Sequence, residues 1–186
     1  MLFMTPRAIT VRLAEPRDAQ AIAMMSRDLI EAGLGWKYDA ARVLRAIRDR
    51  DTLAVVACEG GKAASSSGSR ALAGFAIMEL GDERAHLVLL AVRPSHRRLG
   101  IGQRLLEWLL ESARVAGMAS IHLELRAATE AARRFYRAMG FYETVLVPGY
   151  YRSGEGRKEG ALRMLRVLRA PGPVPYTWRP PRTEDT

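Results

Sequence analysis

The chain has 186 residues, of which 48% are hydrophobic, and this length and composition suit one folded unit with a sizeable core. No apolar run reaches the roughly 18 residues of a membrane-spanning helix, and the N-terminus lacks the long apolar region of a secretory signal. The formal net charge is +9. A general preference for arginine and a functional basic surface explain this charge equally well.

Cysteine usage and motif spacing narrow the class of protein further. The single cysteine, Cys58, cannot form an internal disulfide, so we expect a cytoplasmic protein. We expect Cys58 to be a buried strand residue rather than a catalytic thiol. No zinc-finger spacing or aromatic RNA-binding signature occurs, so a dedicated nucleic-acid-binding role is not expected, although the charge keeps it as an alternative. We expect no metal and no membrane association.

The first half of the chain predicts a strand, two helices and three further strands. Helical spacing of apolar residues ends at Gly33 and Gly35, and Asp39 is the expected N-cap of the second helix. The Gly-, Ser- and Ala-rich residues 60–70 indicate a flexible hairpin connection. The expected elements are a strand at 9–13, helices from about 15 to 32 and 39 to 49, and strands at 53–58, 71–80 and 85–92.

The second half predicts a parallel crossover followed by two more strands. The expected elements are a helix at about 102–116, a strand at 120–125, a helix from about 128 to 140, a strand at 141–147, a loop at 148–160 and a strand at 161–168. These elements define an α/β (α+β) fold class with a mixed, largely antiparallel central sheet flanked by helices. We expect one domain over residues 1–168 and a Pro-rich, extended or disordered tail over 169–186.

A short basic turn joins the strand that ends at Val92 to the following helix. The turn carries Arg97, Arg98 and Gly100, and a strand followed by a glycine turn and a helix directs free backbone N–H groups at an anion. Glycines at such a turn often serve only packing. A dinucleotide-binding fingerprint fits less well, because Leu105 stands at its third glycine. The turn therefore predicts a pyrophosphate site.

The chain resembles the GNAT superfamily of acetyl-CoA-dependent N-acetyltransferases over about residues 8–168. The resemblance rests on Val92-x-Pro94-x-x-Arg97-x-x-Gly100-x-Gly102, on Leu123-Glu124-Leu125-Arg126 and on Phe135-Tyr136-Arg137-Ala138-Met139-Gly140-Phe141. The Leu-Glu-Leu-Arg segment and residues 149–157 make the chain most similar to the bacterial ribosomal-protein-alanine N-acetyltransferases. The resemblance implies a GNAT-like sheet whose strands splay apart after Val92 and hold acetyl-CoA.

The resemblance also implies which residues bind the co-substrate. Backbone groups of Leu90, Ala91 and Val92 are expected to bind the pantetheine arm, and one N–H at the end of this strand to polarise the thioester carbonyl. Thr129 stands where the family usually has Asn; a threonine hydroxyl can still bind CoA, and whether it replaces the Asn contact stays open at this point. The residues expected to cradle the pyrophosphate are Arg97, Arg98, Leu99, Gly100, Ile101, Gly102 and Gln103.

Glu124 and Tyr136 carry the proton chemistry that the resemblance implies. Glu124 would take a proton from the acceptor amine, and Tyr136 would donate one to the departing thiolate. Glu124 lies in an apolar strand, where desolvation predicts a raised pKa. The alternatives are a structural pair of Glu124 with Arg126, His122 as the base, and Tyr136 as a core aromatic residue. His96 is expected to contact solvent or phosphate.

The acceptor side is predicted from two connecting segments. Tyr150 and Tyr151 lie in the expected loop before the last strand, and in the resembling enzymes this region helps to hold the acceptor peptide. The alternative is that they only pack the loop. The link from Gly33 to Tyr38 is expected to form the opposite wall, although Trp36 fits an anchor between the two helices equally well.

The function expected from the resemblance is transfer of an acetyl group to a protein N-terminal α-amine, with a ribosomal protein as one candidate partner. The amine would attack directly in a ternary complex, without a covalent enzyme intermediate. The alternatives are acetylation of a lysine or of a small-molecule amine, and a CoA-binding regulatory module without catalysis. A monomer and a homodimer are both compatible with the sequence.

Overall fold

The computed structural model describes residues 8–60, 72–152 and 158–169, and within these residues seven strands form one sheet. The strands are β1 (Ala8–Leu13), β2 (Thr52–Gly60), β3 (Leu72–Leu80), β4 (Arg84–Val92), β5 (Ser120–Arg126), β6 (Tyr142–Arg152) and β7 (Lys158–Val167). Their order is β1-β2-β3-β4-β5-β7-β6, and the β4–β5 pair is parallel whereas the other pairs are antiparallel. This arrangement confirms the expected fold class.

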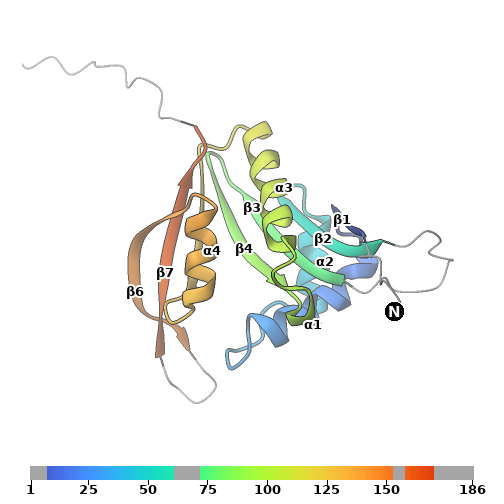
Figure 1. Cartoon of the computed structure of the whole chain (residues 1–186), viewed down its shortest axis with the longest axis horizontal. Coiled ribbons are helices and arrows are strands. Elements are labelled where there is room, and N and C mark those ends of the chain that lie inside the picture. Colours follow the sequence, from blue (N-terminus) through green and yellow to red (C-terminus); the bar gives the residue numbers. More distant parts are fainter. Residues whose placement is uncertain (1–7, 61–71, 153–157, 170–186) are drawn as a thin grey trace, which may run out of the picture.

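Helices cover both faces of the sheet (Figure 1). They are α1 (Ala19–Leu29), α2 (Ala40–Arg48), α3 (Ile101–Val115) and α4 (Glu130–Ala138), with short 3-10 helices η1 (Pro16–Asp18) and η2 (Pro94–His96). One core lies between the sheet and α3 and α4, where Leu105, Leu109 and Met164 are fully buried. A second core lies under α1 and α2, where Ile22 and Phe75 are fully buried. The helical spacing of apolar residues therefore predicted the buried faces correctly.

Helix ends agree with the local sequence signals. The Asp39 side chain accepts a hydrogen bond of 2.8 Å from the Arg42 backbone N–H, which confirms Asp39 as the N-cap of α2. Helix α3 begins directly after Gly100, whose φ of 72° lies in the left-handed region that favours glycine. Cys58 is buried in β2, as expected.

Strand β6 is longer than the sequence predicts. The expected loop over 148–160 is wrong at both ends, because β6 continues to Arg152 and β7 already begins at Lys158. The register shifts between the Val147–Ala161 pair and the Tyr151–Glu159 pair, and Gly149 has a φ of 65°. Pro148 is tolerated in a strand because β6 lies at the edge of the sheet and the ladder is irregular there. Tyr150 and Tyr151 therefore belong to a strand, not to a loop.

The sheet opens between β4 and β5 (Figure 1). The two strands pair only from Arg84–Ser120 to His86–His122, although both strands continue beyond these residues. The β3–β4 register shifts between the Met78–Leu87 and Ile77–Leu89 pairs, which leaves Val88 as a bulge at the same level. The separation thus begins after His86, earlier than the expected point after Val92, because the bulge bends β4 there.

Two sequence expectations fall mainly on residues outside the described ranges. These are the flexible connection at 60–70, of which Gly60 ends β2, and the tail at 169–186, of which only Arg169 is described. Among the described residues, no helix combines the length and the apolar character needed to cross a membrane.

Candidate active site

A cleft of about 570 Å³ lies where β4 and β5 separate. Its lining comes from both strands, from α4, from the end of α1 with the following link, and from the facing ends of β6 and β7. The predicted site residues that line the cleft are Leu90, Glu124, Thr129, Tyr136 and Tyr151. Ala91, Val92 and Tyr150 are not among the lining residues.

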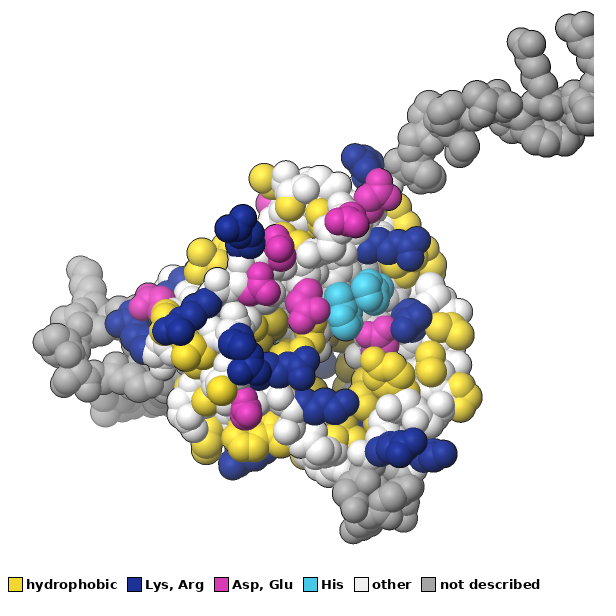
Figure 2. Space-filling model, turned by 180° about the vertical axis from the view of Figure 1, so that it is seen from behind, with side chains coloured by type: hydrophobic (Ala, Val, Ile, Leu, Met, Phe, Trp, Pro, Cys, Tyr) yellow, Lys and Arg dark blue, Asp and Glu magenta, His cyan; other side chains and the backbone are white. Residues whose placement is uncertain are grey.

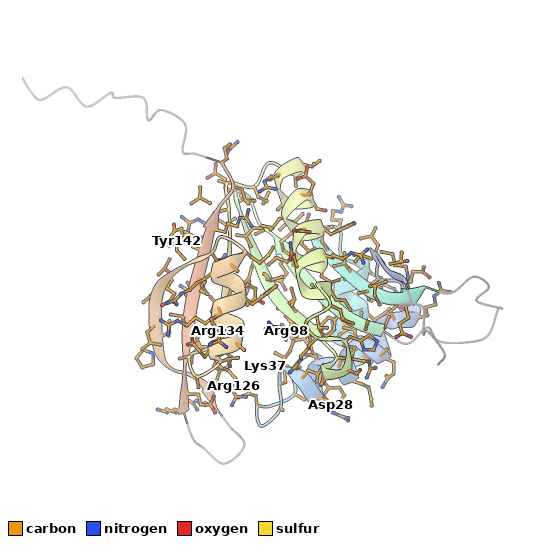
Figure 3. The ribbon with its side chains drawn as sticks, in the orientation of Figure 1. Asp28, Lys37, Arg98, Arg126, Arg134 and Tyr142 are labelled. Carbon is orange, nitrogen blue, oxygen red and sulfur yellow. The ribbon has the colours of Figure 1, made fainter. Side chains whose placement is uncertain are left out.

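The N-terminus of α3 carries a run of unpaired backbone donors. Within the described part of the chain, the N–H groups from Arg98 to Gln103 make no hydrogen bond to a backbone or side-chain acceptor. Arg97 is exposed, and its Nε–H donates to the Val92 carbonyl oxygen over 3.2 Å. Figure 3 shows Arg98 near the N-terminal end of α3. Adjacent amides, the helix dipole and two arginines fit the pyrophosphate of a coenzyme A molecule.

Gly102 lies in the first turn of α3, and the protein leaves room for a larger residue at this position. A Cβ at this position would meet Phe135 at 3.5 Å and Val92 at 3.6 Å, which are ordinary van der Waals distances. Packing within the protein therefore does not require glycine in this first turn, where glycine is less favourable than alanine by about 1 kcal/mol. A glycine here leaves the backbone open to close approach from outside the protein.

Tyr136 presents a protonated hydroxyl to the cleft. Its ring is buried and packs edge-to-face against Phe135 and Phe141, at centroid distances of 5.1 and 5.6 Å. Burial raises the pKa of Tyr136 well above its usual value. The hydroxyl makes no hydrogen bond with the described residues, although Tyr136 lines the cleft. Tyr136 therefore combines a ring packed in the core with a hydroxyl that has no hydrogen-bond partner among the described residues.

Glu124 is held as a carboxylate, which corrects the expectation of a raised pKa. Its Oε2 lies 2.8 Å from His86 Nε2, and its Oε1 accepts a hydrogen bond of 2.7 Å from Arg163 Nε. The hydrogen bond with His86, joined by that from Arg163, lowers the pKa of Glu124 to about 2, even though burial acts in the opposite direction. The alternative pair with Arg126 is also wrong, because Arg126 donates two hydrogen bonds to Glu159.

The two other histidines considered in the sequence have structural partners. His122 stacks on His86 with ring centroids 4.4 Å apart and planes within 3° of parallel. Burial and the neighbouring His86 lower the pKa of His122, which weakens it as an alternative base. His96, expected to meet solvent or phosphate, instead lies 2.8 Å from Glu59 through its Nε2.

The cluster of His86, His122 and Glu124 has the composition of a metal site. One ligand atom from each residue lies within 4.8 Å of the others. The parallel rings direct their nitrogen lone pairs alongside each other rather than towards one point, and the Arg163 guanidinium occupies one carboxylate oxygen. A divalent cation would have to displace that positive charge, so the arrangement favours an acid–base role over metal binding.

The acceptor side of the cleft is built by β6 and by the link after α1. Tyr151 lines the cleft and packs edge-to-face against the exposed Tyr150 at 4.9 Å. Burial raises the pKa of Tyr151 to about 12. Ile30, Ala32 and Leu34 line the cleft from the segment after α1, whereas Trp36 is exposed, with its Nε1–H donating to the Tyr38 carbonyl oxygen.

Buried Glu31 fixes the course of this link. Its carboxylate accepts hydrogen bonds from Ser26 Oγ at 2.8 Å and from the backbone N–H groups of Lys37 at 2.7 Å and Tyr38 at 3.3 Å. Arg126 of β5 also reaches the link, donating from Nη1 to the Ala32 carbonyl oxygen over 3.1 Å, and Figure 3 shows Arg126 and Lys37 at the same end of the molecule. The wall is therefore tied to the strand that carries Glu124.

The sequence did not single out several residues of the site. His86 and Arg163 contact Glu124 across 38 and 39 residues of sequence, and Glu31 organises the link. Val88 and Leu34 line the cleft. The predicted strands at 85–92 and 161–168 already contained His86 and Arg163, but their pairing with Glu124 depends on strand registers that no motif reveals.

Comparison with known proteins agrees with this geometry. A family model described as the acetyltransferase (GNAT) family matches residues 22–141, so the chain belongs to that family. The [ribosomal protein bS18]-alanine N-acetyltransferase of Escherichia coli K12 is 34% identical over 96 residues, which cover 52% of this chain and 65% of that protein. The match thus spans slightly less than two thirds of the relative's length.

Two crystal structures extend the likeness over most of the chain. The ribosomal-protein-S18-alanine N-acetyltransferase from Escherichia coli superposes with a TM-score of 0.70 at 26% identity, covering 91% of this chain and 99% of the other. Ard1 from Thermoplasma volcanium superposes with a TM-score of 0.70 at 26% identity, covering 88% and 99%.

Proposed function

We propose that the protein transfers the acetyl group of acetyl-CoA to an amine bound in the cleft, and that this amine is the N-terminal α-amine of a protein. The observation that carries the proposal is the single opening between β4 and β5, onto which Tyr136 and Glu124 both face. The unpaired amides at the start of α3 supply a site for the pyrophosphate. Membership of the GNAT family supports the reaction class.

Residues at the start of α3 and along β4 bind acetyl-CoA and prepare its carbonyl group for attack. Residues 97–103 hold the pyrophosphate, and the separated edge of β4 at Leu90 offers backbone groups to the pantetheine arm. Bound acetyl-CoA supplies a thioester, which is an acyl group activated towards attack by an amine. The free amine attacks the carbonyl directly, and an N–H of β4 near the Val88 bulge polarises the carbonyl oxygen.

Tyr136 completes the reaction on the leaving-group side. Its hydroxyl faces the cleft, carries a proton at physiological pH and has no partner among the described residues. Donation of this proton to the departing thiolate prevents the thiolate from attacking the new amide. Glu124 lies on the other side of the cleft, where its negative charge attracts the ammonium form of the acceptor.

The choice of an α-amine rests on the relatives and on the shape of the acceptor side. The matched relative from Escherichia coli is named for acetylating an alanine of ribosomal protein bS18, which makes a ribosomal protein one candidate partner here. Tyr151 contributes an aromatic ring and Leu34 an aliphatic side chain to the lining of the cleft. Such apolar surface suits the side chains of a peptide better than a polyamine, which carries a charge at each nitrogen.

The test is a panel of acceptors incubated with the protein and acetyl-CoA and read by intact mass. The panel contains a short peptide that begins with alanine, the same peptide blocked at its N-terminus but carrying a lysine, and a polyamine. We expect the free alanine peptide to gain one acetyl group fastest. Faster acetylation of the blocked peptide or the polyamine would assign a lysine or a small-molecule acceptor instead. Binding of acetyl-CoA without any product would leave a regulatory CoA-binding module.

A further inference from the structure

Glu124, which lines the cleft, is paired with a histidine that does not itself line the cleft and that the reaction described so far does not use. His86 of β4 lies beside Glu124 of β5, with 2.8 Å between His86 Nε2 and Glu124 Oε2. The Glu124 side chain is 6% exposed, whereas the His86 side chain is 31% exposed. Figure 2 shows histidine side chains gathered at the surface of this face, with acidic and basic side chains around them. The imidazole is thus the more accessible partner.

The hydrogen-bond pattern fixes the tautomer of His86. A carboxylate has no proton to give, so His86 Nε2 must carry the proton that is shared with Glu124. In the neutral imidazole, Nδ1 then holds the free lone pair, and it makes no hydrogen bond with the described residues. Glu124 therefore resembles the carboxylate of a hydrolytic triad, which orients the neighbouring histidine ring and stabilises its cation.

Glu124 alone is poorly matched to the task of a base. A carboxyl group whose pKa is about 2 holds a proton far too weakly to remove one from an ammonium group of ordinary pKa near 8. Imidazole is the side chain that ordinarily gains and loses a proton between about pH 5 and 8. Burial and the stacked neighbour His86 lower the pKa of His122, which makes His122 a weak base.

We propose that His86, oriented by Glu124, accepts the proton that the acceptor amine must lose before it attacks. This inference rests on the proposed acetyl transfer. Because His86 lies behind Glu124 and does not line the cleft, one bridging water carries the proton: an N–H bond of the ammonium breaks, the water takes this proton and gives one of its own to Nδ1 of His86, and the electron pair stays on the amine nitrogen. The positive charge moves from the acceptor to the imidazolium, next to the Glu124 carboxylate. Glu124 is then a positioning residue rather than the base.

The groups around the His86–Glu124 pair are mixed in sign. The stacked His122 contributes no charge in its favoured neutral form. The titratable and charged groups that face His86 and Glu124 from these and the neighbouring strands are Glu79 on β3, His122 on β5, Tyr150 and Tyr151 on β6, and Arg163 on β7.

The experiment measures kcat/KM against pH for the wild type, His86→Gln and the matched control His122→Gln, with acetyl-CoA and a short alanine-initiated peptide. Glutamine keeps an N–H that can donate to Glu124 but does not titrate. We expect the wild type and His122→Gln to share one pH profile, in which activity falls towards acid as the base becomes protonated. His86→Gln should be about 100-fold slower at pH 7, and its rate should instead rise with hydroxide up to the amine's own pKa.

Two further outcomes separate the hypotheses. An equal loss at every pH, with the wild-type profile kept in His86→Gln, overturns the proposal and leaves His86 structural. Nitrogen NMR of the wild type gives a readout without turnover: a proton on Nε2 of neutral His86 supports the proposal, and a proton on Nδ1 overturns it. A wild-type protein that acetylates none of the amines in the panel refutes the proposed function itself rather than the role of His86.

Discussion

Substitution of Tyr136 by phenylalanine isolates the chemistry of one hydroxyl in the cleft. The ring would keep its edge-to-face contacts with Phe135 and Phe141, and no hydrogen bond with the described residues would be lost. Removing a desolvated hydroxyl without a partner is nearly neutral for folding, so we expect the free energy of unfolding to change by less than about 1 kcal/mol. Affinity for acetyl-CoA should also be maintained.

Turnover should respond very differently. Loss of a positioned general acid typically lowers the rate by about 10²–10⁴-fold, equivalent to about 2.7–5.4 kcal/mol in the barrier. Because burial raises the pKa of Tyr136, the wild-type hydroxyl stays protonated above its usual range, so we expect no loss of wild-type activity up to about pH 9 from deprotonation of Tyr136. Release of the CoA thiol, read with a chromogenic disulfide, measures the rate.

The matched control is Tyr142→Phe, which removes a hydroxyl from a half-exposed tyrosine on β6, a residue that does not line the cleft. This variant should retain wild-type turnover. Calorimetric titration with acetyl-CoA and thermal unfolding of both variants separate chemistry from binding and folding. Unchanged turnover in Tyr136→Phe, or a loss that matches a loss of acetyl-CoA binding, would refute the assignment of Tyr136 as the acid.

Three further substitutions test the supporting structure. Glu31→Ala should cost about 3 kcal/mol in chemical denaturation, because it leaves the buried Ser26 hydroxyl without its acceptor and removes the acceptor of the Lys37 and Tyr38 N–H groups, whereas the exposed Asp28→Ala should change little. Gly100→Ala should cost about 1–2 kcal/mol from its φ of 72° alone, since no atom lies within 4 Å of the added Cβ; an unchanged midpoint would argue against this backbone conformation. The pKa of Glu124 is lower in the folded protein than the 4.5 of the unfolded chain, so its ionised form stabilises the fold at any pH above about 4.5. This contribution is lost as the pH falls from 4.5 towards about 2. Glu124→Gln should therefore lose less stability over that pH interval than the wild type.

Local signals in the sequence predicted most of the fold. Apolar residues such as Leu105 and Leu109 repeat at helical spacing, and in the structure they are fully buried on the inner face of α3. Gly100 and Asp39 mark helix starts because a left-handed φ and a side-chain cap are properties of single residues. The motif around Gly100 likewise predicted a loop-to-helix turn, and the structure places unpaired amides there.

The electrostatics of the site could not be predicted in the same way. The apolar neighbours of Glu124 in β5 suggested desolvation and a raised pKa, but the partners that decide the pKa come from β4 and β7. Their positions depend on the β4–β5 and β5–β7 registers, which are set by the whole sheet. The extent of β6 was missed for a related reason, because Pro148 indicates a loop unless the strand is known to be an edge.

The most direct test of the central claim is the position of the acetyl group on one peptide that offers both kinds of amine. A peptide with a free N-terminal alanine and an internal lysine is incubated with acetyl-CoA and the wild type or Tyr136→Phe, and the product is sequenced by tandem mass spectrometry. We predict acetylation of the α-amine by the wild type and severely reduced acetylation by the variant. Acetylation of the lysine, or equal product from both proteins, would contradict the account.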